Sequence, residues 1–300
     1  QDRLAMMLDA GFPRVGSIPA AEIRAMMRMG VMAPITEVRQ VRDLVIPHEG
    51  GSIPARLYQA TDAPAGVIVY FHGGGWVLGD LDTADEALRI LATTTDCTII
   101  SVDYRLAPEH PFPAAVDDAF TALVWAAGQR VAWTGRADAP LIVMGDSAGG
   151  NLSTVVALLA RDAGGPDIAL QILVYPAIDG DVDSPAMHAF ESPFLTRDEI
   201  AWFYDQYIPA GQRGDPRFAP GRAGDFANLP PAVILTAEYD LLAEEARCYG
   251  EKLQRAGVEV THLHYDGAIH AFFTMAPLLD IGRKALRDVA GCISRVTDSA

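Results

Sequence analysis

The chain has 300 residues, 50% of them hydrophobic, and carries 23 basic against 39 acidic side chains for a formal net charge of −16. This excess of negative charge excludes nucleic acid and anionic membrane surfaces as expected partners, and no apolar run is long enough to span a membrane. The length and the apolar content suit one large α/β domain with a small accessory element.

The first part of the chain separates into a methionine-rich segment and a hairpin. Residues 1 to about 40 contain helical runs, such as residues 20–29. Such runs suit helices packed on a core, and methionine also makes a pliable wall for a binding cleft. Residues 41–46 and 53–58 then read as two antiparallel strands around the turn at 49–51.

From residue 66 onward, apolar β-branched runs alternate with helical patterns. Strands are expected at 66–71, 98–103, 141–144, 170–175, 232–237 and 258–265, and helices at 83–94, 114–127, 151–161, 241–256 and 281–296. Continuous apolar strands separated by amphipathic helices predict a mostly parallel sheet of about eight strands, with helices on both faces.

A glycine cluster, H-G-G-G-W at 72–76, directly follows the strand expected at 66–71. Backbone N–H groups in such a loop can converge on one point, as acyl transfer requires for its developing oxyanion. A flexible loop and a phosphate-binding loop are the alternatives. The phosphate-binding loop is disfavoured because no G-x-x-x-x-G-K-[ST] occurs and the dinucleotide-binding spacing is absent.

The sequence G-D-S-A-G at 145–149 lies between an expected strand and an expected helix. Strand, G-x-S-x-G and helix in this order are typical of a nucleophile elbow, which presents the serine, here Ser147, at a helix N-terminus. Asp146 could brace this elbow or serve as a plain turn residue. The glycosylation sequon at 151–153 lies on the same helix, where a glycan would destroy the packing.

Residues 180–228 interrupt the alternation of strands and helices. They are rich in proline, glycine and aspartate and hold one helix near 196–207, whose start has Thr196 followed three residues later by Glu199, the pattern of a capping box. The segment is an insertion between sheet elements, either a passive connection or a lid over the site.

A serine nucleophile needs a base, and in α/β-hydrolases the chain order is Ser, Asp/Glu, His. His270 follows the strand 258–265, at the expected carboxyl edge of the sheet. His262 and His264 alternate within that strand, which favours packing or surface roles, and His188 lies in the insertion as a weaker alternative.

Two carboxylates compete to orient the base. Asp240 lies at the end of the strand 232–237 and could also cap the following helix, whereas Glu238 lies two residues earlier. The position at the strand end favours Asp240.

These motifs resemble the hormone-sensitive-lipase family of α/β-hydrolases, the bacterial family IV carboxylesterases, and within it the GDSAG subgroup. The matching pieces span residues 66–275 and are HGGGW at 72–76, DYRLAPEHPFPAAVDDA at 103–119, GDSAGGN at 145–151, LPPAVILTAEYD at 229–240 and DGAIHAFF at 266–273.

The resemblance implies that Ser147 is the nucleophile, His270 the general base and acid, and Asp240 the orienting carboxylate, with no cofactor and no metal. The chain departs from the family pattern at two neighbours. Leu241 follows Asp240 where the family usually has proline, and Ala271 follows His270 where it usually has glycine.

The resemblance also implies an oxyanion hole of backbone N–H groups, contributed by Gly73, Gly74 and Ala148, with Gly75 as a further candidate. In the segment 103–119, a buried polar network behind the site is expected from Arg105, Glu109, His110 and Asp117.

The family implies a cap over the catalytic domain. We expect cap helices in residues 1–40, a cap insertion at 180–228, and an α/β-hydrolase domain formed by 41–179 and 229–300. Apolar cap residues expected to line the pocket or to form the cap core are Met6, Met7, Met26, Met27, Phe190, Phe194, Trp202 and Phe203.

We therefore expect a serine carboxylesterase that hydrolyses small-molecule esters with short- to medium-chain acyl groups through an acyl-enzyme. Amide, carbamate or lactone hydrolysis, peptidase activity and acyl transfer would use the same groups. A non-catalytic ligand-binding protein on this fold is the alternative from another class, but such proteins lack a triad residue and all three are present.

The remaining expectations concern partners and location. The three cysteines, Cys97, Cys248 and Cys292, form no C-x-x-C pair, which predicts reduced thiols in a cytoplasmic protein. A cysteine nucleophile has no support from neighbouring residues. The final helix, 281–296, could pack on the sheet or join a homodimer contact.

Overall fold

A computed structural model of the protein describes residues 14–30 and 33–299. Within these ranges eight strands form one sheet in the order β1-β2-β4-β3-β5-β6-β7-β8. The bounds are β1 Gln40–His48, β2 Gly51–Gln59, β3 Val67–Phe71, β4 Thr98–Val102, β5 Leu141–Asp146, β6 Leu170–Val174, β7 Ala232–Tyr239 and β8 Val260–Ile269. Strand β2 pairs antiparallel with both β1 and β4, and every other pairing is parallel. The mostly parallel sheet predicted from the sequence is confirmed.

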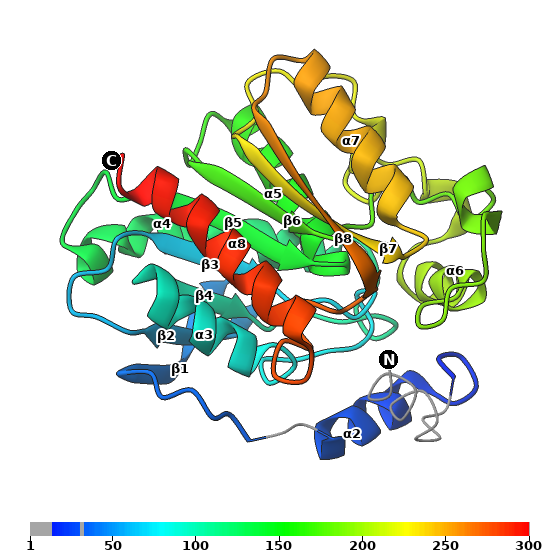
Figure 1. Ribbon diagram of the computed structural model, residues 1–300, viewed down its shortest axis with the longest axis horizontal. Helices are drawn as coiled ribbons and strands as arrows, with labels where there is room; N and C mark the ends of the chain where they lie inside the picture. Colours follow the sequence, from blue (N-terminus) through cyan, green and yellow to red (C-terminus); the bar gives the residue numbers. More distant parts are fainter. Residues whose placement is uncertain (1–13, 31–32, 300) are drawn as a thin grey trace.

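Helices cover both faces of this sheet (Figure 1). The α-helices among the described residues are α2 Ala20–Gly30, α3 Asp85–Thr95, α4 Ala114–Thr134, α5 Ala148–Ala163, α6 Arg197–Tyr207, α7 Ala243–Arg255 and α8 Asp280–Thr297. Helix α3 packs beside α8, and α4 packs beside α5. No helix in the described part of the chain is both long and apolar enough to cross a bilayer.

The central strand β3 explains why the sequence shows unbroken apolar runs. Val67, Val69 and Phe71 belong to the core formed with α4 and α5, whereas Ile68 and Tyr70 belong to the core formed with α3 and α8. Because successive side chains of a strand point to opposite faces, a sheet covered on both sides needs apolar residues at every position.

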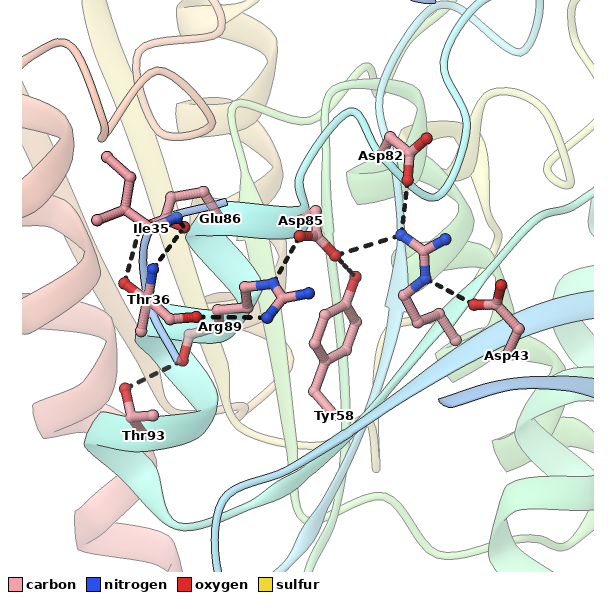
Figure 2. Close-up of polar contacts among 10 residues, drawn as sticks. Ile35, Thr36, Asp43, Tyr58, Asp82, Asp85, Glu86, Arg89 and Thr93 are labelled. Carbon is pink, nitrogen blue, oxygen red and sulfur yellow. Dashed lines mark hydrogen bonds and ion pairs between the residues drawn. The ribbon is translucent and has the colours of Figure 1, made fainter. Parts of the chain in front are cut away.

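A polar cluster attaches the antiparallel end of the sheet to α3 (Figure 2). The buried Asp85 carboxylate accepts hydrogen bonds from Tyr58 of β2 (2.6 Å) and from Arg89 one helical turn later (2.6 Å). Arg56 of β2 bonds Asp85 at 3.3 Å and also Asp43 of β1 at 2.7 Å. The hairpin is thereby held on the helix through charged groups as well as through apolar packing.

The insertion between β6 and β7 has no strand within residues 180–228, all of which the structure describes. It contains the short 3-10 helices η1 Pro185–His188, η2 Ala210–Gln212 and η3 Pro220–Arg222, together with α6. The capping box predicted for α6 is confirmed, since Thr196 and Glu199 each bond the other's backbone N–H. Tyr207 of α6 stacks on Trp76, with ring centroids 4.7 Å apart, so the insertion packs directly on the loop after β3.

Helix α2 is attached to the same region by one arginine. Arg24 donates to the carbonyl oxygens of Val77 (2.6 Å) and Ala107 (2.5 Å) and pairs with Glu109 at 2.8 Å. Ile23, its neighbour, is buried in the core. The N-terminal segment is thus bound close to the loop that follows the glycine cluster.

Candidate active site

The nucleophile elbow joins β5 to α5 without a linker. Strand β5 ends at Asp146, α5 begins at Ala148, and Ser147 between them adopts φ 55° and ψ −117°. A non-glycine residue with positive φ stores strain, and such residues cluster at functional sites. Gly149 permits the close approach, because a Cβ there would lie 1.9 Å from the carbonyl oxygen of Phe71. The elbow holds Ser147 half-buried among fully buried neighbours.

Three side chains from three strand ends form one hydrogen-bonded chain. His270 Nε2 lies 2.9 Å from Ser147 Oγ, and His270 Nδ1 lies 2.7 Å from Asp240 Oδ2. The other oxygen of Asp240 accepts from the Leu242 N–H at 3.0 Å. Because a carboxylate only accepts hydrogen bonds, Asp240 fixes the proton of the neutral imidazole on Nδ1 and leaves Nε2 free to accept from the serine hydroxyl.

The pairing of β7 with β8 brings the base and the acid together. We expected β8 to end at residue 265, but it continues to Ile269, so that His270 follows the strand directly. Beyond a register shift between Ala237 and Tyr239, Tyr239 pairs with Ile269. The residues that immediately follow this pair are Asp240 and His270, and the ladder therefore sets their separation.

The competing residues have other partners. Glu238 is exposed and accepts a hydrogen bond from the Gly267 N–H at 2.6 Å. His262 and His264 both bond the Thr236 hydroxyl, at 2.8 and 2.9 Å. His188 lies exposed in η1. Glu238, His262 and His264 are thus bonded to groups other than Ser147.

The loop after β3 requires one correction to the expected oxyanion donors. The Gly73 N–H donates to Asp146 Oδ1 at 2.8 Å, so it is not available to an oxyanion. Gly74 and Gly75 follow with φ of 116° and 60°, conformations that glycine adopts without strain. The candidate donors that remain are therefore Gly74 and Gly75 together with Ala148, the residue after Ser147.

Asp146 is buried beside this loop. Its Oδ1 accepts from the Tyr70 hydroxyl at 2.5 Å as well as from Gly73. Burial raises the pKa of Asp146, and the Tyr70 hydrogen bond, the nearby His270 and the Gly73 N–H oppose that rise. The residue thus braces the elbow by connecting it to the glycine loop.

The polar network expected in the segment 103–119 is divided and uses a different aspartate. Arg105 pairs at 2.7 Å with the fully buried Asp118, whereas Asp117 is exposed. Glu109 pairs with Arg24 of α2, and His110 is exposed. Asp117 and Asp118 are consecutive residues of α4, and successive side chains of a helix point to different sides of it.

Two residues bind the backbone where the insertion begins and near where it ends. Neither was assigned to the site from the sequence. Asn151, on α5, donates to the carbonyl oxygens of Ala177 (2.9 Å) and Phe218 (2.7 Å). Glu245, on α7, accepts from the Ile178 N–H at 2.6 Å, and burial raises its pKa to about 8. The sequence signal for Asn151 is its place at the end of the GDSAGGN motif at 145–151.

The apolar residues expected in the cap take different positions. Phe203 of α6 lies over the glycine loop, since a Cβ on Gly75 would lie 2.2 Å from its ring. In the same way, a Cβ on Gly16 would lie 3.0 Å from the ring of Trp202. Phe190 lines a hollow of about 360 Å³ between η1 and α7, beside Asp240. The other described members, all half-buried, are Met26, Met27 and Phe194. Met6 and Met7 lie outside the described residues.

In the described ranges, no group of three or more His, Cys, Asp or Glu side chains is arranged to hold a metal ion. The titratable groups around Ser147 are instead joined pairwise by hydrogen bonds. This arrangement suits proton transfer and nucleophilic attack.

Comparison with known proteins gives consistent results. A family model described as the alpha/beta hydrolase fold matches residues 68–274. The carboxylesterase NlhH of Mycobacterium tuberculosis is 38% identical over 294 residues, which cover 94% of this chain and 91% of that protein. The carboxylic ester hydrolase LipN of the same organism is 42% identical over 246 residues, 79% of this chain but 65% of the longer relative. A hyperthermophilic esterase from the archaeon Pyrobaculum calidifontis superimposes with a TM-score of 0.90 at 36% identity, covering 98% of this chain and 97% of that chain.

Proposed function

The chain belongs to the hormone-sensitive-lipase family of α/β-hydrolases as a carboxylic ester hydrolase, and we propose that Ser147, His270 and Asp240 carry out its reaction. The observation that supports this assignment is the hydrogen-bonded chain from Asp240 through His270 to Ser147, with heavy-atom distances of 2.7 and 2.9 Å. Geometry of this kind identifies a nucleophile, its base and the group that orients the base.

In the first half of the reaction, Ser147 Oγ attacks the ester carbonyl carbon while His270 Nε2 takes the hydroxyl proton. The Asp240 carboxylate stabilises the imidazolium that forms. The carbonyl oxygen becomes an oxyanion and accepts hydrogen bonds from the N–H groups of Gly74, Gly75 and Ala148. The imidazolium then protonates the leaving alcohol, and an acyl-serine remains.

In the second half, His270 removes a proton from a water molecule that attacks the acyl carbon. The same N–H groups stabilise the second oxyanion, and the Ser147 oxygen leaves with the proton from His270. The carboxylic acid product and the starting enzyme result.

The substrate proposal rests on the cap. The insertion at 180–228 and the described part of residues 1–40 serve as the cap, and Phe203 restricts the space above Gly75. A bulky aromatic side chain at the oxyanion loop favours small apolar acyl groups, so we assign short- to medium-chain esters. Amides, carbamates and lactones present the same carbonyl chemistry and form the second candidate class.

The partners and the location complete the proposal. The protein acts on a small-molecule ester in the cytoplasm, which its free cysteines Cys97, Cys248 and Cys292 support. The proposal includes a homodimer, for which the sheet offers two terminal strands, β1 and β8. Helix α8 is already packed against α3 and the sheet.

The decisive experiment is hydrolysis of p-nitrophenyl esters from acetate to palmitate by the wild type and by Ser147→Ala. Activity is expected to peak at short chains and kcat to fall by about 10³- to 10⁶-fold in the variant, because the alanine cannot form the acyl-enzyme. Circular dichroism controls for folding. Near-normal turnover by folded Ser147→Ala would reject the mechanism, and an inactive but folded wild type would favour a ligand-binding protein.

A further inference from the structure

The nucleophile elbow and the oxyanion loop meet at one carboxylate. Asp146 Oδ1 accepts the Gly73 N–H at 2.8 Å and the Tyr70 hydroxyl at 2.5 Å. Asp146 is 5% exposed and Tyr70 is fully buried, so water does not compete for either bond. The Gly73 bond connects the nucleophile elbow directly with the oxyanion loop, because Asp146 immediately precedes Ser147 and Gly73 immediately precedes the proposed donors.

The contact between Gly73 and Asp146 requires glycine at position 73. A Cβ on Gly73 would lie 2.4 Å from Asp146 Oδ2, a distance that would force the carboxylate or the loop to move. The missing side chain therefore lets the backbone N–H reach the carboxylate. Tyr70 bonds the same oxygen from the face of β3 that also carries Ile68 and packs under α3 and α8.

The position of the loop matters because oxyanion donors act at hydrogen-bond range of a charge that exists only in the transition state. A small displacement of such donors weakens transition-state binding and leaves ground-state binding almost unchanged. The Asp146 bond fixes the peptide unit between His72 and Gly73, one unit before the one that carries the Gly74 N–H, and thereby orients the start of the segment whose Gly74 and Gly75 N–H groups face the oxyanion.

We propose that Asp146 is a positioning residue for ester hydrolysis: its carboxylate fixes the oxyanion loop on the nucleophile elbow through the Gly73 N–H, and Tyr70 holds the carboxylate in place. This inference rests on the proposed function of Ser147. It assigns a catalytic consequence to the second residue of the GDSAG motif, although Asp146 itself contacts no reacting atom.

The test compares Asp146→Ala, Asp146→Asn and Tyr70→Phe by steady-state kinetics with p-nitrophenyl butyrate. Asp146→Ala removes the acceptor, and we expect kcat to fall by about 10- to 100-fold while KM stays within about threefold, less than for direct loss of a donor. Asp146→Asn keeps an acceptor oxygen and is expected to recover most of kcat. Tyr70→Phe is expected to lower kcat by about two- to tenfold at unchanged KM.

Two controls separate this inference from its premises. Asp118→Asn alters another buried carboxylate, paired with Arg105 far along the chain from the elbow, and is expected to lower the melting temperature without changing kcat. Ser147→Ala reports on the proposed function itself. If Ser147→Ala is active, the proposed function fails, whatever Asp146 does.

If Ser147→Ala is inactive and folded Asp146→Ala retains wild-type kcat, the positioning role alone is rejected. It is also rejected if Asp146→Ala raises KM with kcat unchanged, or if Asp146→Asn is as impaired as Asp146→Ala. Should Asp146→Ala fail to fold, wild-type kcat in Tyr70→Phe would reject the proposal, and a lowered kcat at unchanged KM would support it.

Discussion

Two carboxylates lie two residues apart at the end of β7, and their partners differ. Asp240 is buried and bonds the imidazole of His270, whereas Glu238 is exposed and bonds the backbone of Gly267. We predict that Asp240→Asn lowers kcat by about 10³- to 10⁴-fold, because an amide can present N–H to His270 and reverse its tautomer.

Glu238→Gln is the matched control and is expected to keep kcat within about twofold of the wild type. Both variants would be assayed with the same short-chain ester, after circular dichroism. A large loss of kcat in Glu238→Gln, together with an active Asp240→Asn, would identify Glu238 rather than Asp240 as the carboxylate that orients His270.

At the scale of residues, the sequence predicts the chemical groups better than their hydrogen bonds. The order of motifs is sufficient to select Ser147, Asp240 and His270. It could not reveal that the Gly73 N–H is occupied by Asp146, since three consecutive glycines look equivalent in a sequence. In the same way, Asp118 rather than Asp117 pairs with Arg105, because the choice depends on which side of α4 is buried.

At the scale of elements, the chain segment that leads into the insertion is held by the first turn of α7. Glu245 is buried there, accepts the Ile178 N–H and has a pKa raised by burial to about 8. Because this folded-state pKa exceeds the unfolded value of about 4.3, the folded protein binds an extra proton between these pH values. Its contribution to stability is complete below about pH 4.3 and is lost as the pH rises toward 8.

In the wild type, the free energy of unfolding is therefore expected to be lower at pH 9 than at pH 5. We predict that this difference is smaller in Glu245→Gln by about 1–3 kcal/mol. Urea unfolding at both pH values measures the difference. Glu244→Gln, a change at the exposed neighbour, is the control and should retain the pH dependence of the wild type. Equal pH dependence in Glu245→Gln and the wild type would contradict this assignment.

Element boundaries show where local patterns are insufficient. The strands were predictable because burial on both faces leaves apolar residues throughout, as in β3. Helix α4 was expected to end at residue 127 but continues to Thr134 and ends at Gly135 with φ 73°. Gly128 lies exposed within the helix, and a glycine there costs only about 1 kcal/mol, which packing of the helix offsets. Strand β8 continues past Asp266-Gly267 because this turn sequence forms an irregularity within the strand: Gly267 has φ 75°, and pairing with β7 moves from Ala237–Tyr265 to Tyr239–Ile269.

At the scale of the whole molecule, Arg24 attaches α2 to the catalytic domain. Its guanidinium bonds the carbonyl oxygens of Val77 and Ala107 and the carboxylate of Glu109. Charge-assisted hydrogen bonds contribute about 1.5–3 kcal/mol each. We predict that Arg24→Ala increases the rate of thermolysin cleavage within residues 14–34 by about tenfold or more, because local opening becomes easier.

Arg28→Ala is the control on the same helix, where the side chain is exposed. It should leave the cleavage rate close to that of the wild type. If Arg24→Ala is as resistant as Arg28→Ala, the arginine does not determine how the N-terminal segment is held, and apolar contacts such as Ile23 do.

The distances along the chain within the triad have a consequence for the order of events during synthesis. His270 is 123 positions from Ser147 and 30 from Asp240, and it follows the strand at one edge of the sheet. A chain emerging from the ribosome N-terminus first presents the proposed nucleophile long before the proposed base has been synthesised. On this assignment, the nascent protein is expected to be inactive toward esters until β8 has joined the sheet. In refolding experiments, turnover should accordingly recover only after β8 has paired with β7.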